Sequence, residues 1–145
     1  MSYGFDDKNN FYIDVNPLAR TVGSPREEFA ERANSILNTY DNCILSFSGG
    51  TDSQATYLAF RDAGKDIPCA FMRMKGYNDN EYQNVKACID KWKINVTIVD
   101  LDPYKLKEKI LKESNQYKIP PNQILHSIFL EKISDKLTWI EGFNG

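Results

Sequence analysis

The chain has 145 residues, the usual size of one domain, and its 41% hydrophobic and 12% aromatic content is typical of a folded globular protein rather than a disordered one. The formal net charge is −2, from 18 basic and 20 acidic residues, so overall charge gives no support to nucleic-acid binding. The three cysteines, Cys43, Cys69 and Cys88, are odd in number and lack C-x-x-C spacing, which argues against a disulfide framework and a four-thiolate zinc site.

No apolar run approaches the roughly 20 residues that a membrane-spanning helix needs. The first seven residues, Met1 to Asp7, lack the basic start and the apolar core of a signal peptide. We therefore expect a cytoplasmic protein.

Residues 1–23 mix Asn, Asp and Pro with little periodicity, and we interpret them as an irregular lead-in with one short strand at 11–13. A helix is predicted to begin after Ser24, because serine caps helices, Pro25 suits the first helical position and Glu27 completes a capping box. Its inward face is predicted from helical spacing to be Phe29, Ala33, Ile36, Leu37 and Tyr40. The main domain is expected to span residues 24–145.

Beyond this helix, strands and helices alternate. Short apolar or β-branched runs predict strands at 43–47, 67–74, 95–99 and 137–140. Helical periodicity predicts helices at 53–63, 81–92, 103–114 and 123–134. The first of these four is expected to end at Gly64 as its C-cap and to face inward with Ala55, Leu58, Ala59 and Ala63. The alternation predicts an α/β fold, a three-layer α/β/α domain with a mainly parallel, Rossmann-like sheet.

The one pair of adjacent glycines, Gly49-Gly50, follows the first of these four strands. Ligands of parallel α/β sheets bind at the carboxyl ends of the strands. Two glycines let the backbone approach a bulky anion, and the helix that follows directs its amino-terminal amides at that anion. Ser48, Thr51 and Ser53 add hydroxyl donors. The turn therefore predicts a phosphate site.

Other phosphate and nucleophile motifs fit this turn less well. No lysine follows Gly50 as in G-x-x-x-x-G-K-[ST], there is no G-x-G-x-x-G, and neither Ser48 nor Ser53 is flanked as in G-x-S-x-G. Asp52 is a carboxylate at a place where anions bind. We expect it either to cap the helix or to contact a metal ion that bridges phosphate oxygens.

The segment Ser48-Gly49-Gly50-Thr51-Asp52-Ser53 resembles the S-G-G-x-D-S pyrophosphate loop of the PP-loop ATP pyrophosphatase superfamily. The strand–helix order from Cys43 to Gly145 resembles the core of the same family, whose fold is adenine nucleotide alpha-hydrolase-like (HUP). The resemblance implies ATP and Mg²⁺ as cofactors, Asp52 and Ser53 as catalytic residues, and Asp52 as the metal ligand.

The resemblance also implies a nucleotide-binding surface. In the family, backbone at the end of the second strand faces adenine, and the loop after the fourth strand has forms such as G-H-N-A-D-D, which residues 141–145 resemble. The implied nucleotide-binding residues are Ser46, Phe47, Ser48, Gly49, Gly50, Thr51, Asp52, Ser53, Phe71, Met72, Arg73, Met74, Gly142 and Asn144. The family core usually continues with an acidic residue and a fifth strand, so we expect a truncated chain, a split gene or a minimal viral or plasmid-borne version of the core. The last of these would need a protein partner or second subunit to complete the site.

The function implied is adenylation of a substrate oxygen with release of pyrophosphate, followed by attack of ammonia, as in asparagine synthetases. Their second helix opens with a D-E that Asn78-Asp79-Asn80-Glu81 resembles. One alternative is sulfur or nitrogen transfer of the PAPS-reductase or tRNA-modification type, although no cysteine follows Cys88 to serve reductase chemistry. Another is a non-catalytic nucleotide-binding module, or half of a two-chain enzyme. For the adenylation function, the acceptor substrate is expected to be an unidentified small molecule.

Three other groups of polar residues carry weaker signals. His126 is expected to be a surface or packed histidine rather than a catalytic base. Arg73 and Lys75 follow the second strand, where they either neutralise phosphate charge or remain solvated. Asp100 and Asp102 follow the third strand, and we favour helix capping over metal binding for them.

Overall fold

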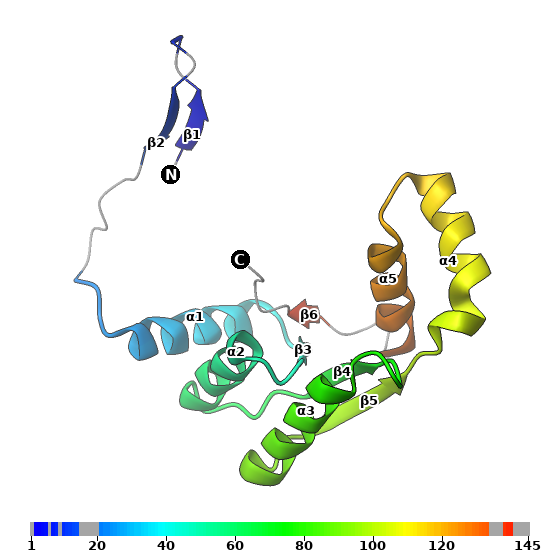
Figure 1. Cartoon of the computed structure of the whole chain (residues 1–145). Coiled ribbons are helices and arrows are strands. Elements are labelled where there is room, and N and C mark those ends of the chain that lie inside the picture. Colours follow the sequence, from blue (N-terminus) through cyan, green and yellow to red (C-terminus); the bar gives the residue numbers. More distant parts are fainter. Residues whose placement is uncertain (1, 6, 9, 15–20, 134–137, 141–145) are drawn as a thin grey trace.

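The computed structural model describes residues 2–5, 7–8, 10–14, 21–133 and 138–140. At the amino-terminal end, β1 (Ser2–Phe5) and β2 (Phe11–Asp14) form an antiparallel pair in which Ser2 lies opposite Asp14. The strand expected at 11–13 is therefore present. The first strand was not expected, since four residues with one glycine give little periodic signal. In Figure 1 this hairpin stands apart from the larger sheet.

Helix α1 (Pro25–Thr39) begins with the predicted capping box. The Ser24 amide donates to Glu27 Oε2 at 2.7 Å, and the Glu27 amide donates to Ser24 Oγ at 3.4 Å. This exchange satisfies two amides that have no partner within the helix, which fixes where the helix starts. Of the predicted inward face, Ala33 is buried, but Phe29 is 57% exposed and Tyr40 48% exposed, so those two were assigned to the wrong side.

The main sheet has four parallel strands in the order β5-β4-β3-β6. They are β3 (Cys43–Ser46), β4 (Cys69–Arg73), β5 (Val96–Asp100) and β6 (Thr138–Ile140), so all four predicted strands are confirmed within a few residues. Because all four run the same way, their carboxyl ends meet at one edge, which positions the turn after β3 beside the ends of β4 and β6.

Helices cover both faces of this sheet, which confirms the three-layer prediction (Figure 1). Alternate residues of β3 and β4 point to opposite sides, as the pleat requires. Leu45 and Cys69 pack with α1, α2 (Thr51–Asp62) and α3 (Asp79–Trp92), whereas Ile44 and Ala70 pack with α4 (Pro103–Tyr117) and α5 (Pro121–Ile133). Two apolar cores, one on each face, hold the strands in place.

The inward face predicted for α2 is confirmed in part, since Ala59 and Ala63 pack against the core. The buried residues of the helix are Ser53, Tyr57 and Phe60, whereas Leu58 is 37% exposed and lines a surface groove beside α1 with Ala55. The helix is apolar on two sides, and the larger aromatic rings win the place on the sheet because they remove more apolar area from water. Gly64 follows the helix with φ of +80°, as its predicted capping role requires.

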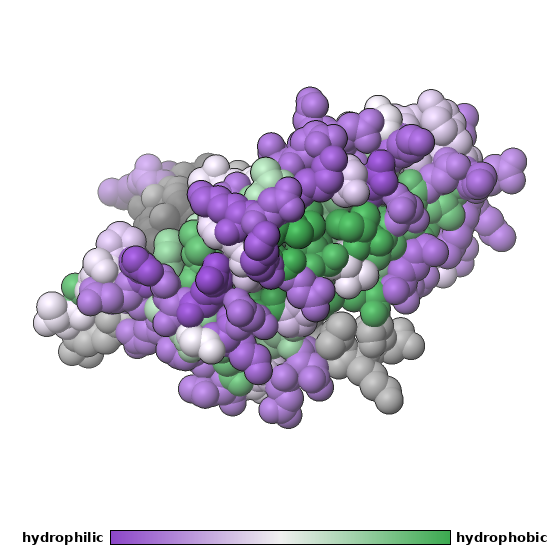
Figure 2. All heavy atoms as spheres, turned by 90° about the horizontal axis from the view of Figure 1, so that it is seen from below, coloured by the Kyte–Doolittle hydropathy of each residue, from purple (hydrophilic) through white to green (hydrophobic). Residues whose placement is uncertain are grey.

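Figure 2 shows apolar side chains gathered in a band across one face of the molecule, between hydrophilic ones. β5 is the outer strand of the sheet, and its residues Val96, Ile98 and Val99 are only half-buried. Among the described residues no strand pairs with its outer edge.

No helix in the described part of the chain is long and apolar enough to cross a membrane.

Two buried side chains that can lose a proton, Tyr57 and Cys69, should make the stability of the fold sensitive to alkaline pH. Burial, then a 3.0 Å hydrogen bond to Asp66, raises the pKa of Tyr57 to about 12, and burial raises the pKa of Cys69 to about 12. Both groups keep their protons to higher pH when folded than when unfolded. Their contribution is therefore complete below their ordinary pKa values and is lost as the pH rises towards 12.

We accordingly expect the free energy of unfolding, measured in urea, to fall from pH 8 to pH 11. Tyr57→Phe should reduce the part of that fall above pH 10, because the group that ionises on unfolding is gone. An unchanged pH dependence in this variant would contradict the assignment to Tyr57. Tyr117→Phe serves as a control, since Tyr117 is 61% exposed.

Candidate functional site

The glycine turn connects the end of β3 to the start of α2. Ser46 ends the strand, Phe47 is fully buried beneath the turn, and Gly49 has φ of +74°. Gly50 is the residue that precedes α2, and having no side chain it provides no capping hydrogen bond. The first amides of α2 are thus left without a side-chain cap, as a helix start that receives an anion requires.

Gly49 lies directly against α3. A β-carbon at this position would lie 2.8 Å from the Val85 amide nitrogen and 3.0 Å from the Asn84 carbonyl carbon. Real β-carbons do not approach backbone this closely, so only glycine fits here, for reasons of both space and dihedral angle. This close approach fixes the turn between the first residues of α2 and the middle of α3.

Two serine hydroxyls hold the turn in shape. Ser53 Oγ donates to the Gly50 carbonyl at 3.0 Å and lies 3.3 Å from Ser48 Oγ, which also accepts from the Gly50 amide at 3.3 Å. Ser53 is only 6% exposed, so in this structure its hydroxyl supports the turn rather than facing solvent. Gln54 Nε2 adds a 2.8 Å bond to the Gly49 carbonyl. These hydrogen bonds hold the backbone of the turn in one conformation.

Asp52 is the second residue of α2 and is exposed. The capping role considered for it is wrong, because Gly50 occupies the cap position and α2 has no side-chain cap. Contact with a metal ion is the remaining prediction for this carboxylate. No group of three or more His, Cys, Asp or Glu side chains that could hold a metal by itself is found in the described part of the chain.

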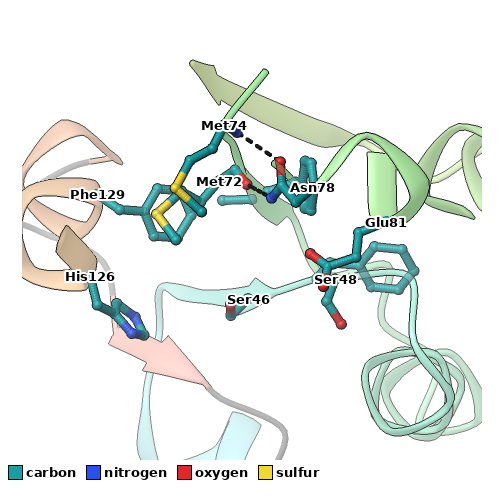
Figure 3. Close-up of a pocket in the computed structure, with 11 residues that line it drawn as sticks. Ser46, Ser48, Met72, Met74, Asn78, Glu81, His126 and Phe129 are labelled. Atoms are coloured by element: carbon teal, nitrogen blue, oxygen red, sulfur yellow. Dashed lines mark hydrogen bonds between the residues drawn. The ribbon is translucent and has the colours of Figure 1, made fainter. Parts of the chain in front are cut away.

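A pocket of about 210 Å³ opens beside the turn (Figure 3). Ser46 and Ser48 form one side, Met72 and Met74 from the end of β4 form another, and α5 closes the side opposite the turn. Its full lining is Ser46, Phe47, Ser48, Ala70, Phe71, Met72, Met74, Asn78, Glu81, His126 and Phe129. Six of the predicted nucleotide-binding residues therefore come together here, from two strands and the turn.

Of the other eight predicted nucleotide-binding residues, Gly49, Gly50, Asp52 and Ser53 belong to the turn and the start of α2 described above. Thr51 is exposed at the start of α2. The Arg73 guanidinium lies 4.1 Å from the centre of the Tyr82 ring and its Nη1 is 3.7 Å from Asp100 Oδ1, in a second hollow of about 550 Å³. Gly142 and Asn144 lie outside the described residues.

Lys75 and the two acids at the end of β5, Asp100 and Asp102, can also be placed in relation to the second hollow. Lys75 lines it together with Arg73, so both cations lie away from the glycine turn's pocket. Asp102 caps α4, accepting from the amides of Tyr104 at 3.1 Å and Lys105 at 3.3 Å, which confirms the capping role. Asp100 instead faces the Arg73 guanidinium.

Two pocket residues from α5 were not predicted as site residues. His126 and Phe129 lie three positions apart, on one side of the helix, with ring centres 6.1 Å apart. Three-residue spacing does place two side chains on the same helical face, but it cannot show which face meets the pocket. In Figure 3 the His126 ring lies across the pocket from Glu81 and Ser48. His126 is thus a wall of the pocket rather than a plain surface residue.

The three cysteines are free and buried. Burial raises the pKa of Cys43, Cys69 and Cys88 above the ordinary range for a thiol. Little reactive thiolate is present at neutral pH, so these three side chains behave as small apolar groups of the core.

No protein-family model and no curated protein matches the sequence. Among solved structures, the chain is similar to a glutamine-dependent NAD⁺ synthetase from Acinetobacter baumannii in complex with adenosine diphosphate, with 14% identity and a TM-score of 0.53. The match covers 79% of this chain and 23% of that one. The fold is of the NAD⁺ synthetase type.

An NMN synthetase from Francisella tularensis is similar as well, with 15% identity and a TM-score of 0.49, over 65% of this chain and 41% of that chain. This chain therefore spans less than half the length of either protein. At such low identity the NAD⁺ synthetase-type fold is what the comparison establishes, and it agrees with the fold implied by the S-G-G-x-D-S resemblance.

Proposed function

We propose that this protein binds ATP, with its phosphates on residues 48–53 and its base in the adjoining pocket, and uses it to adenylate an oxygen of a second substrate. The observation that carries the proposal is the turn itself. A positive-φ glycine is packed against α3, and an uncapped helix start follows at the carboxyl end of an inner strand of the sheet. Residues 24–145 form the nucleotide-binding domain in this proposal.

The size and lining of the pocket support this placement of ATP. A volume of about 210 Å³ is smaller than the roughly 300 Å³ at which pockets for whole drug-sized ligands begin, so it suits a base and little more. Met72, Met74 and Phe129 give one end of the pocket an apolar lining, whereas Ser46 and Ser48 lie towards the turn. A nucleotide would place its flat base among the apolar side chains and its charged phosphates outside, on the turn.

The proposed reaction begins when an acceptor oxygen attacks the α-phosphorus of ATP. A new P–O bond forms, the bond between the α-phosphorus and the bridging oxygen to the β-phosphate breaks, and pyrophosphate leaves with that electron pair. Backbone amides at the start of α2 would stabilise its charge. For a carboxylate acceptor, ammonia would then attack the carbon that carries the adenylated oxygen. A C–N bond forms, the C–O bond to AMP breaks and the nitrogen loses a proton, giving an amide as asparagine synthetases do.

Two exposed carboxylates near the turn fit the proposed Mg²⁺. Asp52 lies on the first turn of α2, and Glu81 lies on the first turn of α3 and lines the pocket. Mg²⁺ is usually bound by one or two carboxylates together with substrate phosphates, so a larger protein cluster is not required. When bound, the ion would neutralise charge on the phosphate oxygens.

A pyrophosphate-release assay with Mg-ATP, ammonia and a panel of carboxylic acids tests turnover. We expect release with at least one acid, and Asp52→Asn should lower it at least about tenfold because a ligand for the metal is lost. Asp90→Asn, an exposed acid on the last turns of α3, is the control. ATP binding by calorimetry without any pyrophosphate release would contradict adenylation and leave a nucleotide-binding module.

A further inference from the structure

Asn78, the residue just before α3, joins the two ends of a short stretch of backbone beside the pocket. Its Nδ2 donates to the Met72 carbonyl at 2.8 Å, and its Oδ1 accepts from the Met74 amide at 2.8 Å. Both bonds are drawn in Figure 3, where the carboxamide lies between β4 and the start of α3. One side chain thus holds the point at which the chain leaves the sheet.

The backbone that Asn78 holds carries one wall of the pocket. Met72 and Met74 point their side chains into the hollow, and both are half-buried. The neighbouring strand β3 cannot hold this stretch, because it turns away after Phe47, whose amide makes a 2.9 Å bond to the Ala70 carbonyl. Beyond Ala70 the side of β4 that faced β3 must find other partners, and Asn78 supplies them.

The Met74 carbonyl closes the turn from the other direction. It accepts from the Tyr77 amide at 2.9 Å and from the Asn78 amide at 3.2 Å. Asn78 is therefore bonded to this turn through both its backbone and its side chain. A wall made of two flexible methionine side chains owes its position to this fixed backbone.

We propose that Asn78 is a positioning residue that sets the preference of the pocket for adenine. By fixing Met72 and Met74, it gives the apolar end of the pocket the shape and depth of one kind of base. This inference rests on the proposed function, which puts the base at that end and the phosphates on the turn. Asn78 acts on the base end alone, because its hydrogen bonds go to Met72, Met74 and Tyr82 and not to residues 46–54.

The chemistry of the bridge requires a carboxamide. Asparagine both donates and accepts, on neighbouring atoms. Aspartate has the same shape but no donor when ionised, so Asn78→Asp would keep the bond from the Met74 amide and place a carboxylate oxygen against the Met72 carbonyl. The repulsion should move Met72 and with it the pocket wall.

Isothermal calorimetry with Mg-ATP, Mg-GTP and Mg-CTP tests the proposal. The wild-type protein should prefer ATP, and Asn78→Asp should lose about tenfold in affinity for ATP while its affinities for GTP and CTP change by less than about twofold. Asn80→Asp is the matched control, because it adds the same charge two residues away on the first turn of α3, where the side chain is exposed. It should leave all three affinities unchanged.

Each other outcome overturns the inference. Equal weakening of all three nucleotides by Asn78→Asp would show a general structural role, and no base preference in the wild-type protein would leave nothing for Asn78 to set. Binding of none of the three by the wild-type protein would instead remove the proposed function, so the two failures are distinguishable. If Asn78→Asp does not fold, Asn78→Ser, which is uncharged and too short to bridge both groups, is measured in the same way.

Discussion

Gly50→Val is expected to abolish measurable ATP binding while the protein still folds. Gly50 has φ of −76° and ψ of 168°, an extended conformation open to any residue, and an added β-carbon would approach only Ser48 Oγ, at 3.3 Å. The backbone therefore accepts valine. Its branched side chain, however, would stand over the uncapped start of α2, where the phosphates are proposed to lie.

The loss of even one charge-assisted hydrogen bond to phosphate is worth about 2 kcal/mol, or about thirtyfold in affinity. Calorimetry with Mg-ATP measures it, and circular dichroism with thermal unfolding checks that the fold is retained. Ala55→Val, an exposed change of similar size one turn further along α2, is the control and should bind ATP as the wild-type protein does. Wild-type affinity in a folded Gly50→Val protein would remove the turn as the phosphate site.

Gly49→Ala is expected to have the largest effect on stability of any single-methyl change in the turn. Its φ of +74° costs an alanine about 1–2 kcal/mol, and its new β-carbon would meet the Val85 amide nitrogen at 2.8 Å, which neither backbone can easily avoid. We expect the free energy of unfolding in urea to fall by about 2–4 kcal/mol in total.

The neighbouring glycine provides the matched control for this prediction. Gly50→Ala adds the same methyl one residue later, at an ordinary φ and with a single contact to a side-chain oxygen, so it should cost less than about 1 kcal/mol. Equal losses in the two variants would contradict the close approach of the turn to α3. The pair thus separates the residue that builds the turn from the residue that leaves room for a ligand.

Local signals in the sequence predicted the four strands of the main sheet, most helix ends and the turn. The capping box of Ser24 and Glu27 and the C-cap at Gly64 need only neighbouring residues, so they could be assigned without knowing the fold. The glycine turn could likewise be placed at the ligand edge, because each strand is followed by a helix and the sheet is parallel.

Features that depend on packing between distant elements could not be predicted in this way. The apolar residues of α2 are compatible with burial of either of two faces of the helix. Only its packing on the sheet shows that Tyr57 lies on the buried face. His126 reaches the pocket because α5 packs on the face of the sheet opposite α2 and α3. The residues near His126 in the sequence do not indicate this packing. The Arg73 guanidinium lies over the Tyr82 ring and near Asp100, and the residues next to it in the sequence give no sign of either contact.

The Asn78 bridge is a third kind of feature. Its two partners are only six and four residues away, but they are backbone groups, and backbone groups leave no trace in the residue types. Asparagine is common in turns that precede a helix. Its presence at position 78 could therefore be explained from the sequence without any role in the pocket.

The approach of Gly49 to α3 is an approach to main-chain atoms, the nitrogen of Val85 and the carbonyl carbon of Asn84. Main-chain atoms are the same in every amino acid. The contact therefore places little demand on the exposed Asn84 side chain beyond its β-carbon, whereas Val85 is kept apolar by its own burial in the core. The contact itself restricts the residue type only at position 49, where a hydrogen atom must take the place of a side chain.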